Sequence, residues 1–178
     1  MDTNKLREQL KIDEGVKYEV YDDHLGYKTF GIGHLVVAGD EEYGAPVGTP
    51  VSEERVNAVF DSDVQKYIDE SKKVFPNLED LPEEAQQVIV NMCFNMGAPR
   101  LGKFKKFIAA VNDGNWSTAA VEMMDSRWAK QVGNRAERLR DRVEALAWNL
   151  KRLNDEKEAE GLKERNKANE ELMKYRSI

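Results

Sequence analysis

Two acidic side chains and one hydroxyl near the start of the chain could act together on a single substrate. Glu14 lies nine residues before Asp23, and Asp23 lies six residues before Thr29. Hydrolysis of a glycosidic bond needs one carboxylic acid that donates a proton and a second, ionised carboxylate that assists water. The chain has 33 acidic residues, so the spacing fits equally well a surface Glu and an Asp that favours turns.

A short helix is expected to position Glu14. Leu6, Leu10 and Ile12 recur at helical spacing, and Gly15 follows as a residue that ends helices. Glu14 would therefore close this helix, packed against Ile12 and partly removed from water. The alternating residues 16–20, the turn at 22–26 and the returning strand at 27–33 then predict a hairpin that carries Asp23 and Thr29.

The remaining pattern predicts an α+β fold with a small β lobe at about residues 15–50, including a possible third strand near 35–37. A long helix begins after Ser52, a good N-cap, and ends at Pro76. It would join the β lobe to a larger helical lobe, about residues 51–153 plus the first helix, with a cleft between the lobes. Four further helices are expected at about 82–96, 104–111, 116–124 and 135–153.

The last segment, residues 154–178, differs in composition from the domain at 1–153. About half of its residues are charged, with both signs mixed, and strong helix formers dominate. We expect a solvated helix or a disordered tail, and we keep open a role in binding a partner or in self-association.

Composition excludes several classes of protein. The formal net charge of −6 disfavours non-specific nucleic-acid binding. Cys93 is the one cysteine, so we expect a buried small hydrophobe and no internal disulfide. No apolar run is long enough to span a membrane, and the N-terminal residues lack the pattern of a signal peptide. We therefore expect no stable membrane association and a protein made in the cytoplasm.

Three ordered groups of residues resemble the phage lysozymes of the T-even type. The resemblance covers about the first 150 residues. Its first group is Ile12-Asp13-Glu14-Gly15, Tyr21, Asp23, Gly26-Tyr27, Thr29 and Gly31-Ile32-Gly33-His34-Leu35. The second is Asn91-Met92 with Phe94-Asn95-Met96-Gly97, and the third is Ser126-Arg127-Trp128, Gln131, Asn134-Arg135-Ala136 and Arg138, followed by Trp148.

This resemblance implies a lysozyme-like fold and an endo-acting muramidase. Such an enzyme hydrolyses the β-1,4 bond between N-acetylmuramic acid and N-acetylglucosamine in bacterial peptidoglycan. Glu14 matches the general acid, Asp23 the second carboxylate, and Thr29 the hydroxyl that positions the attacking water. The family is taken to invert the anomeric centre, and the resemblance implies no cofactor and no metal.

The resemblance also implies supporting and substrate-binding residues. His34 matches a histidine that pairs with a carboxylate of the helical lobe, and Arg135 an arginine near the catalytic Glu. The positions that match the saccharide-binding residues are Leu35, Phe94, Asn95, Phe107 and Glu122. Phe107 and Glu122 depart from the small polar residues of the family, which weakens the expectation of sugar contacts there.

Two alternatives stay open. A lytic transglycosylase would use Glu14 without Asp23 and Thr29. A catalytically idle glycan-binding or phage-tail-associated module would keep the cleft without the reaction. For the hydrolase we expect residence in the host cytoplasm, followed by release to the cell wall through a holin-type pore.

Overall fold

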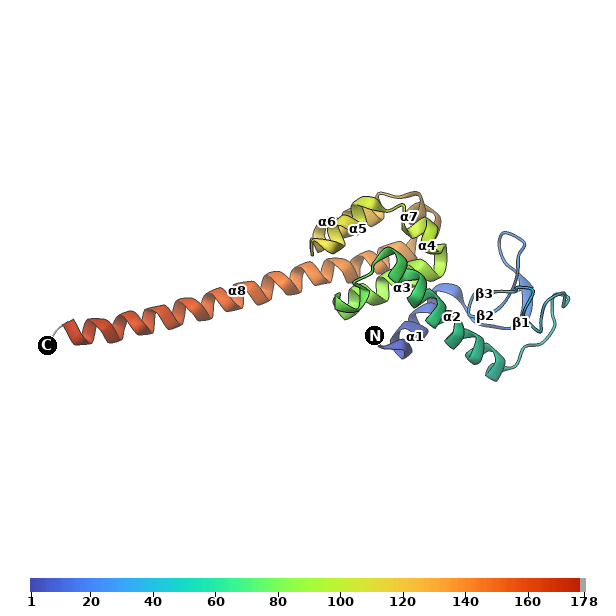
Figure 1. Ribbon diagram of the computed structural model, residues 1–178, viewed down its shortest axis with the longest axis horizontal. Helices are drawn as coiled ribbons and strands as arrows, with labels where there is room; N and C mark the ends of the chain where they lie inside the picture. The colour runs from blue at the N-terminus through green and yellow to red at the C-terminus, as the bar shows by residue number, and fades with distance from the viewer. Residues whose placement is uncertain (177–178) are drawn as a thin grey trace. The chain divides into compact units, whose positions relative to one another are not determined.

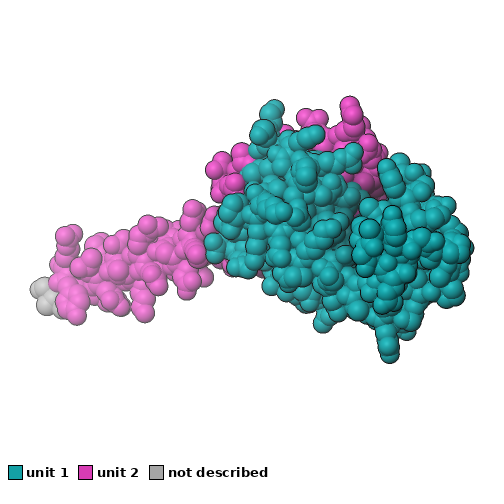
Figure 2. Space-filling view, turned by 45° about the vertical axis from the view of Figure 1, so that its right-hand side comes forward, with its two compact units in different colours: residues 1–108 teal, residues 109–178 magenta. Residues whose placement is uncertain are grey.

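The computed structural model describes residues 1–176 and has the expected α+β, lysozyme-like fold (Figure 1). The chain divides into two compact units, Met1–Ile108 and Ala109–Ile178 (Figure 2). The elements are α1 (Thr3–Glu14), β1 (Lys17–Asp22), β2 (Lys28–Gly31), β3 (His34–Leu35), α2 (Glu53–Val74), a 3-10 turn (Leu78–Asp80), α3 (Glu83–Met96), α4 (Ala98–Leu101), α5 (Lys105–Asn112), α6 (Trp116–Met124), α7 (Arg127–Val132) and α8 (Asn134–Arg176).

Helix α1 ends where its glycine predicts. Gly15 has a φ of 75°, which L side chains rarely adopt, and its N–H donates to the carbonyl of Lys11. Glu14 is therefore the last helical residue. The prediction of a helix closed by Glu14 is confirmed.

The expected packing of Ile12 is wrong. Leu6 and Leu10 are fully buried, whereas the Ile12 side chain is 66% exposed. At about 3.6 residues per turn, Ile12 lies about 240° around the helix from Leu6, so it cannot share the buried stripe. Ile12 therefore does not shield Glu14 from water in the way the sequence suggested.

The three strands form one antiparallel sheet in the order β1-β2-β3. Tyr21 on β1 is paired with Thr29 on β2, and Thr29 is paired with Leu35 on β3. The third strand is only two residues long, at His34–Leu35. The hairpin is thus confirmed, and its register places Thr29 in the central strand.

Helix α2 begins as predicted and connects the sheet to the helical part of the first unit. The Ser52 hydroxyl caps it by accepting from the Arg55 N–H at 3.1 Å. Val56 lies so close to β2 that a Cβ at Gly31 would meet its Cγ1 at 3.1 Å. The glycine allows the sheet backbone to approach the helix to within van der Waals contact.

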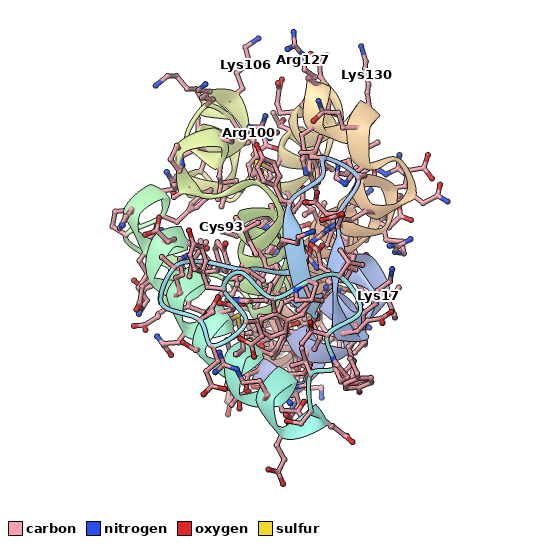
Figure 3. The ribbon with its side chains drawn as sticks, turned by 90° about the vertical axis from the view of Figure 1, so that its right-hand side faces the viewer. Lys17, Cys93, Arg100, Lys106, Arg127 and Lys130 are labelled. Atoms are coloured by element: carbon pink, nitrogen blue, oxygen red, sulfur yellow. The ribbon has the colours of Figure 1, made fainter. Side chains whose placement is uncertain are left out.

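Helix α3 supplies most of the core of the first unit. Nine of its 14 residues are buried, including the whole run from 87 to 94. Cys93, labelled in Figure 3, is fully buried, and burial raises the pKa of its thiol. Its burial confirms the prediction of a small buried hydrophobe. A buried thiol with a raised pKa is a poor nucleophile.

Helix α8 is a single helix of 43 residues. Its first turns pack against α6 and α7, with Leu139 and Val143 buried. It continues without a break through the domain boundary predicted between residues 153 and 154, so the predicted tail is helical as far as Arg176. No helix in residues 1–176 combines the length and apolarity that a membrane span requires.

Candidate active site

Tyr21 lies within electrostatic range of both predicted catalytic carboxylates. Burial raises the pKa of the Tyr21 hydroxyl, and the carboxylates of Glu14 and Asp23 raise it further. Both carboxylates therefore lie within electrostatic range of one side chain. Thr29 is the partner of Tyr21 across the β1–β2 pair. The hairpin thus carries Asp23 and Thr29 close to Tyr21, and the Glu14 carboxylate at the end of α1 acts on the same hydroxyl.

A backbone carbonyl joins Asp23 to Thr29. The Asp23 N–H and the Thr29 hydroxyl both donate to the carbonyl of Tyr27, at 2.9 and 3.0 Å. Asp23 Oδ1 in turn accepts from the N–H groups of Leu25 and Tyr27, at 2.8 and 2.9 Å. These bonds fix the turn, so the Asp23 carboxylate is held in position by its own loop.

The turn between β2 and β3 holds Glu14. A Cβ at Gly33 would lie 3.0 Å from Glu14 Oε2 and 3.1 Å from its Cγ. Gly33 also has a φ of 63°. The absence of a side chain at Gly33 therefore allows the Glu14 carboxylate to lie directly against the backbone of the turn.

The backbone at Glu14 is fixed to helix α3 through the neighbouring residue, Asp13. Asn91, fully buried on α3, donates its side-chain N–H to Asp13 Oδ2 at 2.8 Å. This bond ties the last turn of α1 to the core. Sequence reasoning quoted Asp13 and Asn91 only as part of the family pattern and gave neither a role. An acid and an amide 78 residues apart carry no local signal that they meet.

Lys17 is a second residue that the sequence did not single out. Its ammonium lies 4.2 Å from the centre of the Tyr21 ring, on the strand that leads to Asp23 (Figure 3). A cation and the face of an aromatic ring attract each other, and this attraction favours one orientation of the ring. Lys17 therefore helps to orient the Tyr21 ring, which lies near the predicted catalytic residues.

His34 is held between two carboxylates. Its Nδ1 lies 2.6 Å from Asp63 Oδ2 on α2, and its Nε2 lies 2.8 Å from Asp40 Oδ2. Burial lowers the pKa of His34, but the hydrogen bonds and charges of Asp63 and Asp40 outweigh burial and leave it raised. Asp63 is a carboxylate partner of the kind that the resemblance implied; Asp40 was not foreseen.

Arg55 extends this cluster toward the loop that follows β3. Its guanidinium makes two hydrogen bonds to the Glu42 carboxylate, at 2.9 and 3.0 Å, and lies 3.7 Å from Asp40. The bonds to Arg55 hold the pKa of Glu42 below its usual value. The loop is thus fixed to α2 by alternating charges. Among residues 1–176, no group of three or more His, Cys, Asp or Glu side chains is placed to hold a metal ion.

The predicted substrate-binding residues of the first unit differ in exposure. Leu35 is 50% exposed, and Asn95 is also exposed. Phe94 is 7% exposed, and its ring centre lies 4.9 Å from that of Tyr67. Burial raises the pKa of Tyr67, and Asp63 and Glu14 are among the acids that raise it further. Phe94 thus contacts the ring of Tyr67, and the Tyr67 hydroxyl lies within electrostatic range of Glu14.

The prediction that Phe107 binds sugar is not supported by its position. Phe107 is 1% exposed, and its ring contacts the rings of Phe75 and Phe104, each with a centroid distance of 6.3 Å. A ring enclosed in this way contributes to the core and is not available to a surface ligand.

Two predicted site residues belong to the second unit. Arg135, in the first turn of α8, is 6% exposed, and Glu122 on α6 is half-buried. A buried arginine needs compensating interactions, and Arg135 has at least one hydrogen bond, ion pair, ring contact or electrostatic interaction. The roles of Arg135 beside the catalytic Glu and of Glu122 in sugar binding stay predictions.

Comparisons with known proteins identify the family of this chain. The model of the family described as phage lysozyme matches residues 11–146. The probable T4-type lysozyme 1 of Dictyostelium discoideum is 30% identical over 155 residues, which is 76% of this chain and 91% of that protein. The pre-baseplate central spike protein Gp5 of Enterobacteria phage T4 is 30% identical over 75% of this chain but 26% of its own length. The peptidoglycan hydrolase gp36 of Pseudomonas phage phiKMV is 27% identical over 76% of this chain and 15% of its own length.

Proposed function

Because this chain belongs to the phage lysozyme family and is a lysozyme-like peptidoglycan hydrolase, we propose that it is an endo-acting muramidase. It cleaves the β-1,4 bond between N-acetylmuramic acid and N-acetylglucosamine. The observation that carries this proposal is the placement of both carboxylates at the small sheet: Asp23 and Thr29 share the Tyr27 carbonyl, and Glu14 lies against the backbone of Gly33. These are the two carboxylates and the hydroxyl that such a reaction needs.

Glu14 acts as the proton donor. It protonates the bridging oxygen as the bond to C1 of the muramic acid breaks, so the departing N-acetylglucosamine leaves with a hydroxyl at C4. Water adds to C1, and Asp23 accepts the proton that this water loses. The atoms balance with one water consumed, one glycosidic bond broken and one new reducing end formed. Asp23 also stabilises the positive charge that develops at C1.

Thr29 orients the attacking water. Its hydroxyl hydrogen is engaged by the carbonyl of Tyr27 at 3.0 Å, and its side chain is almost fully buried. A hydroxyl that already donates can only accept from a further partner. Thr29 therefore accepts a hydrogen from the water, which turns a lone pair of that water toward C1.

Two other activities are less well supported by these residues. A lytic transglycosylase needs no second carboxylate, and here Asp23 is held by two N–H groups in the same hairpin as Thr29. An idle glycan-binding module would have no need for the positioning of either residue. Asp23 and Thr29 together therefore favour hydrolysis.

Access to the wall has two possible routes. We propose that the protein acts from the host cytoplasm after a holin-type pore opens. The similarity to the central spike protein Gp5 favours, as a second candidate, an enzyme carried by a phage tail. Detection of the chain in purified virions by mass spectrometry would decide for the second route, and its absence from them for the first.

The substitution Glu14→Gln tests the assignment of the acid. The amide keeps the size of the side chain but cannot donate the proton, so we expect the clearing of purified cell walls to slow by at least about 100-fold. The matched control is Glu8→Gln on the same helix, because Glu8 is exposed and pairs only with Lys11 within residues 1–176. Clearing by Glu14→Gln at the rate of Glu8→Gln would refute the assignment.

A further inference from the structure

The C-terminal half of α8 is a helix without a buried face. Within residues 154–176 the side chains are exposed, apart from the partly covered Gly161. Helices in proteins owe most of their stability to the packing of an apolar face. Gly161 lowers helix propensity further. A helix of this kind is expected to be stabilised by a partner.

One face of this segment carries apolar residues at half of the positions of a coiled-coil seam, and Arg, Asp and Asn at the other half. Counting in alternate steps of four and three residues from Trp148, the seam positions are Trp148, Arg152, Asp155, Ala159, Leu162, Asn166, Asn169 and Met173. Trp148, Leu162 and Met173 are 71%, 52% and 66% exposed. Two shallow surface hollows lie along the same face. Trp148 and Ala159 are among the residues that line the first, and Asn166 and Met173 are among those that line the second.

The opposite face is charged at most positions, with Gly161 and Ala168 as uncharged members. From Lys157 to Lys174 its outermost positions are Lys157, Glu160, Glu164, Lys167, Glu171 and Lys174. Alternating Glu and Lys of this kind form a solvated outer face. Helices that lie on anionic membranes carry a polar face rich in Lys and Arg instead. The charge pattern therefore favours another helix over a lipid surface as the partner.

The positions that flank the seam match a second copy of the same helix. In a parallel coiled coil, the last residue of each heptad (position g) faces position e of the following heptad on the partner. With Asn166 at position a, the three facing pairs are Lys151 with Glu156, Glu158 with Lys163, and Arg165 with Glu170. Each of these pairs combines opposite charges, and each would occur twice in a two-fold dimer.

The same charges select one register. A shift of the partner by one heptad would place Lys151 opposite Lys163 and Glu158 opposite Glu170. A shift in the other direction would place Glu158 opposite Glu156 and Arg165 opposite Lys163. Like charges at these positions oppose pairing. Among these three registers, only the in-register arrangement makes all three flanking pairs attractive. It also places Arg152 and Asp155 of the seam opposite their own counterparts, which weakens the pairing near the start of the segment.

We propose that the α8 segment from Trp148 to Met173 pairs in parallel and in register with the same segment of a second copy of this chain, forming a two-stranded coiled coil. Asn166 would face its counterpart at an a position, where asparagine favours a defined register and a dimer at a cost in stability. The pairing would join two lysozyme units and so raise the avidity of the protein for a polymeric wall.

A charge reversal tests the pairing on the full chain. Arg165→Glu converts two attractive pairs into repulsive ones, so we expect sedimentation equilibrium to show a dimer Kd raised by roughly tenfold or more. The matched control is Lys157→Glu, which makes the same change in net charge on the outer face. Its Kd should stay within about twofold of the wild-type value.

A second reversal fixes the orientation. Arg165→Glu combined with Glu170→Arg restores opposite charges in the parallel register, so the double variant should regain the wild-type Kd. A wild-type chain that stays monomeric at about 100 μM would overturn the proposal. So would equal weakening by Lys157→Glu, failure of the double variant to recover, or binding to anionic lipid vesicles in place of dimerisation.

Discussion

Asp23 has two separate tasks, one in the fold of its turn and one in the proposed reaction. Its Oδ1 accepts from the N–H groups of Leu25 and Tyr27, and its charge would serve the attacking water. Asp23→Asn keeps an oxygen acceptor but loses the charge. We expect it to retain the wild-type melting temperature and to lose about 100-fold or more in the rate of wall clearing.

Asp23→Ala should differ from Asp23→Asn in stability. It removes the acceptor as well, so unfolding should become easier by about 1 kcal/mol, with the same loss of activity. Circular dichroism and a turbidity assay measure the two effects independently. Wild-type clearing by Asp23→Asn would contradict the role assigned to the charge.

The two carboxylates around His34 predict a pH-dependent stability. The pKa of folded His34 lies above its ordinary value of 6.5. The stabilisation by the protonated ring is therefore complete below pH 6.5 and is lost as the pH rises through the folded pKa. We expect the melting temperature of His34→Gln to fall further below that of the wild type at about pH 5.5 than at about pH 9.

The matched control for this measurement is His24→Gln, at the exposed turn before β2. Its effect on the melting temperature should be small and the same at both pH values. At the acid end, the lowered pKa of Asp40 means that its contribution is lost only as the pH falls below the ordinary value of 3.8. A gap for His34→Gln that widens toward pH 9 would be inconsistent with a raised pKa.

At the scale of elements, the turn between β2 and β3 is as important to the site as the side chains. A methyl group at Gly33 would lie 3.0 Å from Glu14 Oε2. Gly33→Ala should therefore displace the carboxylate by a few tenths of an ångström and lower the clearing rate by about 10-fold, less than the about 100-fold that a misplacement of about 1 Å can cost.

The control for Gly33→Ala is Gly48→Ala. Gly48 also has a positive φ, of 90°, but a Cβ there meets nothing within 4 Å. Both variants should lose similar stability from backbone strain, about 1 to 2 kcal/mol. Only Gly33→Ala should lose activity at a temperature where both are folded. Equal activity in the two variants would show that the position of Glu14 does not depend on Gly33.

The elements themselves were predictable where a local signal marks an end. Gly15 ended α1 and Ser52 began α2 as predicted. The short helices α4 and α7 were missed, because four and six residues are too few to establish a helical period. Ile12 was assigned to the wrong face of α1. Leu6 and Leu10 define the buried stripe, and the angle of Ile12 around the helix places it outside that stripe.

At the scale of the whole chain, the sequence predicted the fold class and the hairpin that carries Asp23 and Thr29, but not what long-range packing decides. The enclosure of Phe107 by Phe75 and Phe104 joins residues that have no local pattern in common. The bond from Asn91 to Asp13 and the second carboxylate on His34 are of the same kind. Mixed charge and strong helix formers in the tail favoured a solvated helix and left disorder open, and α8 is helical to Arg176.

The most direct test of the proposed function is the chemistry of the ends that the wild-type protein leaves on purified peptidoglycan. Products would be reduced with borohydride and analysed by mass spectrometry, with Glu14→Gln as the blank. Hydrolysis at the muramic acid predicts fragments that end in reducible N-acetylmuramic acid and are absent from the blank. Anhydro-muramic ends, reducible N-acetylglucosamine ends, or equal products from Glu14→Gln would contradict the account.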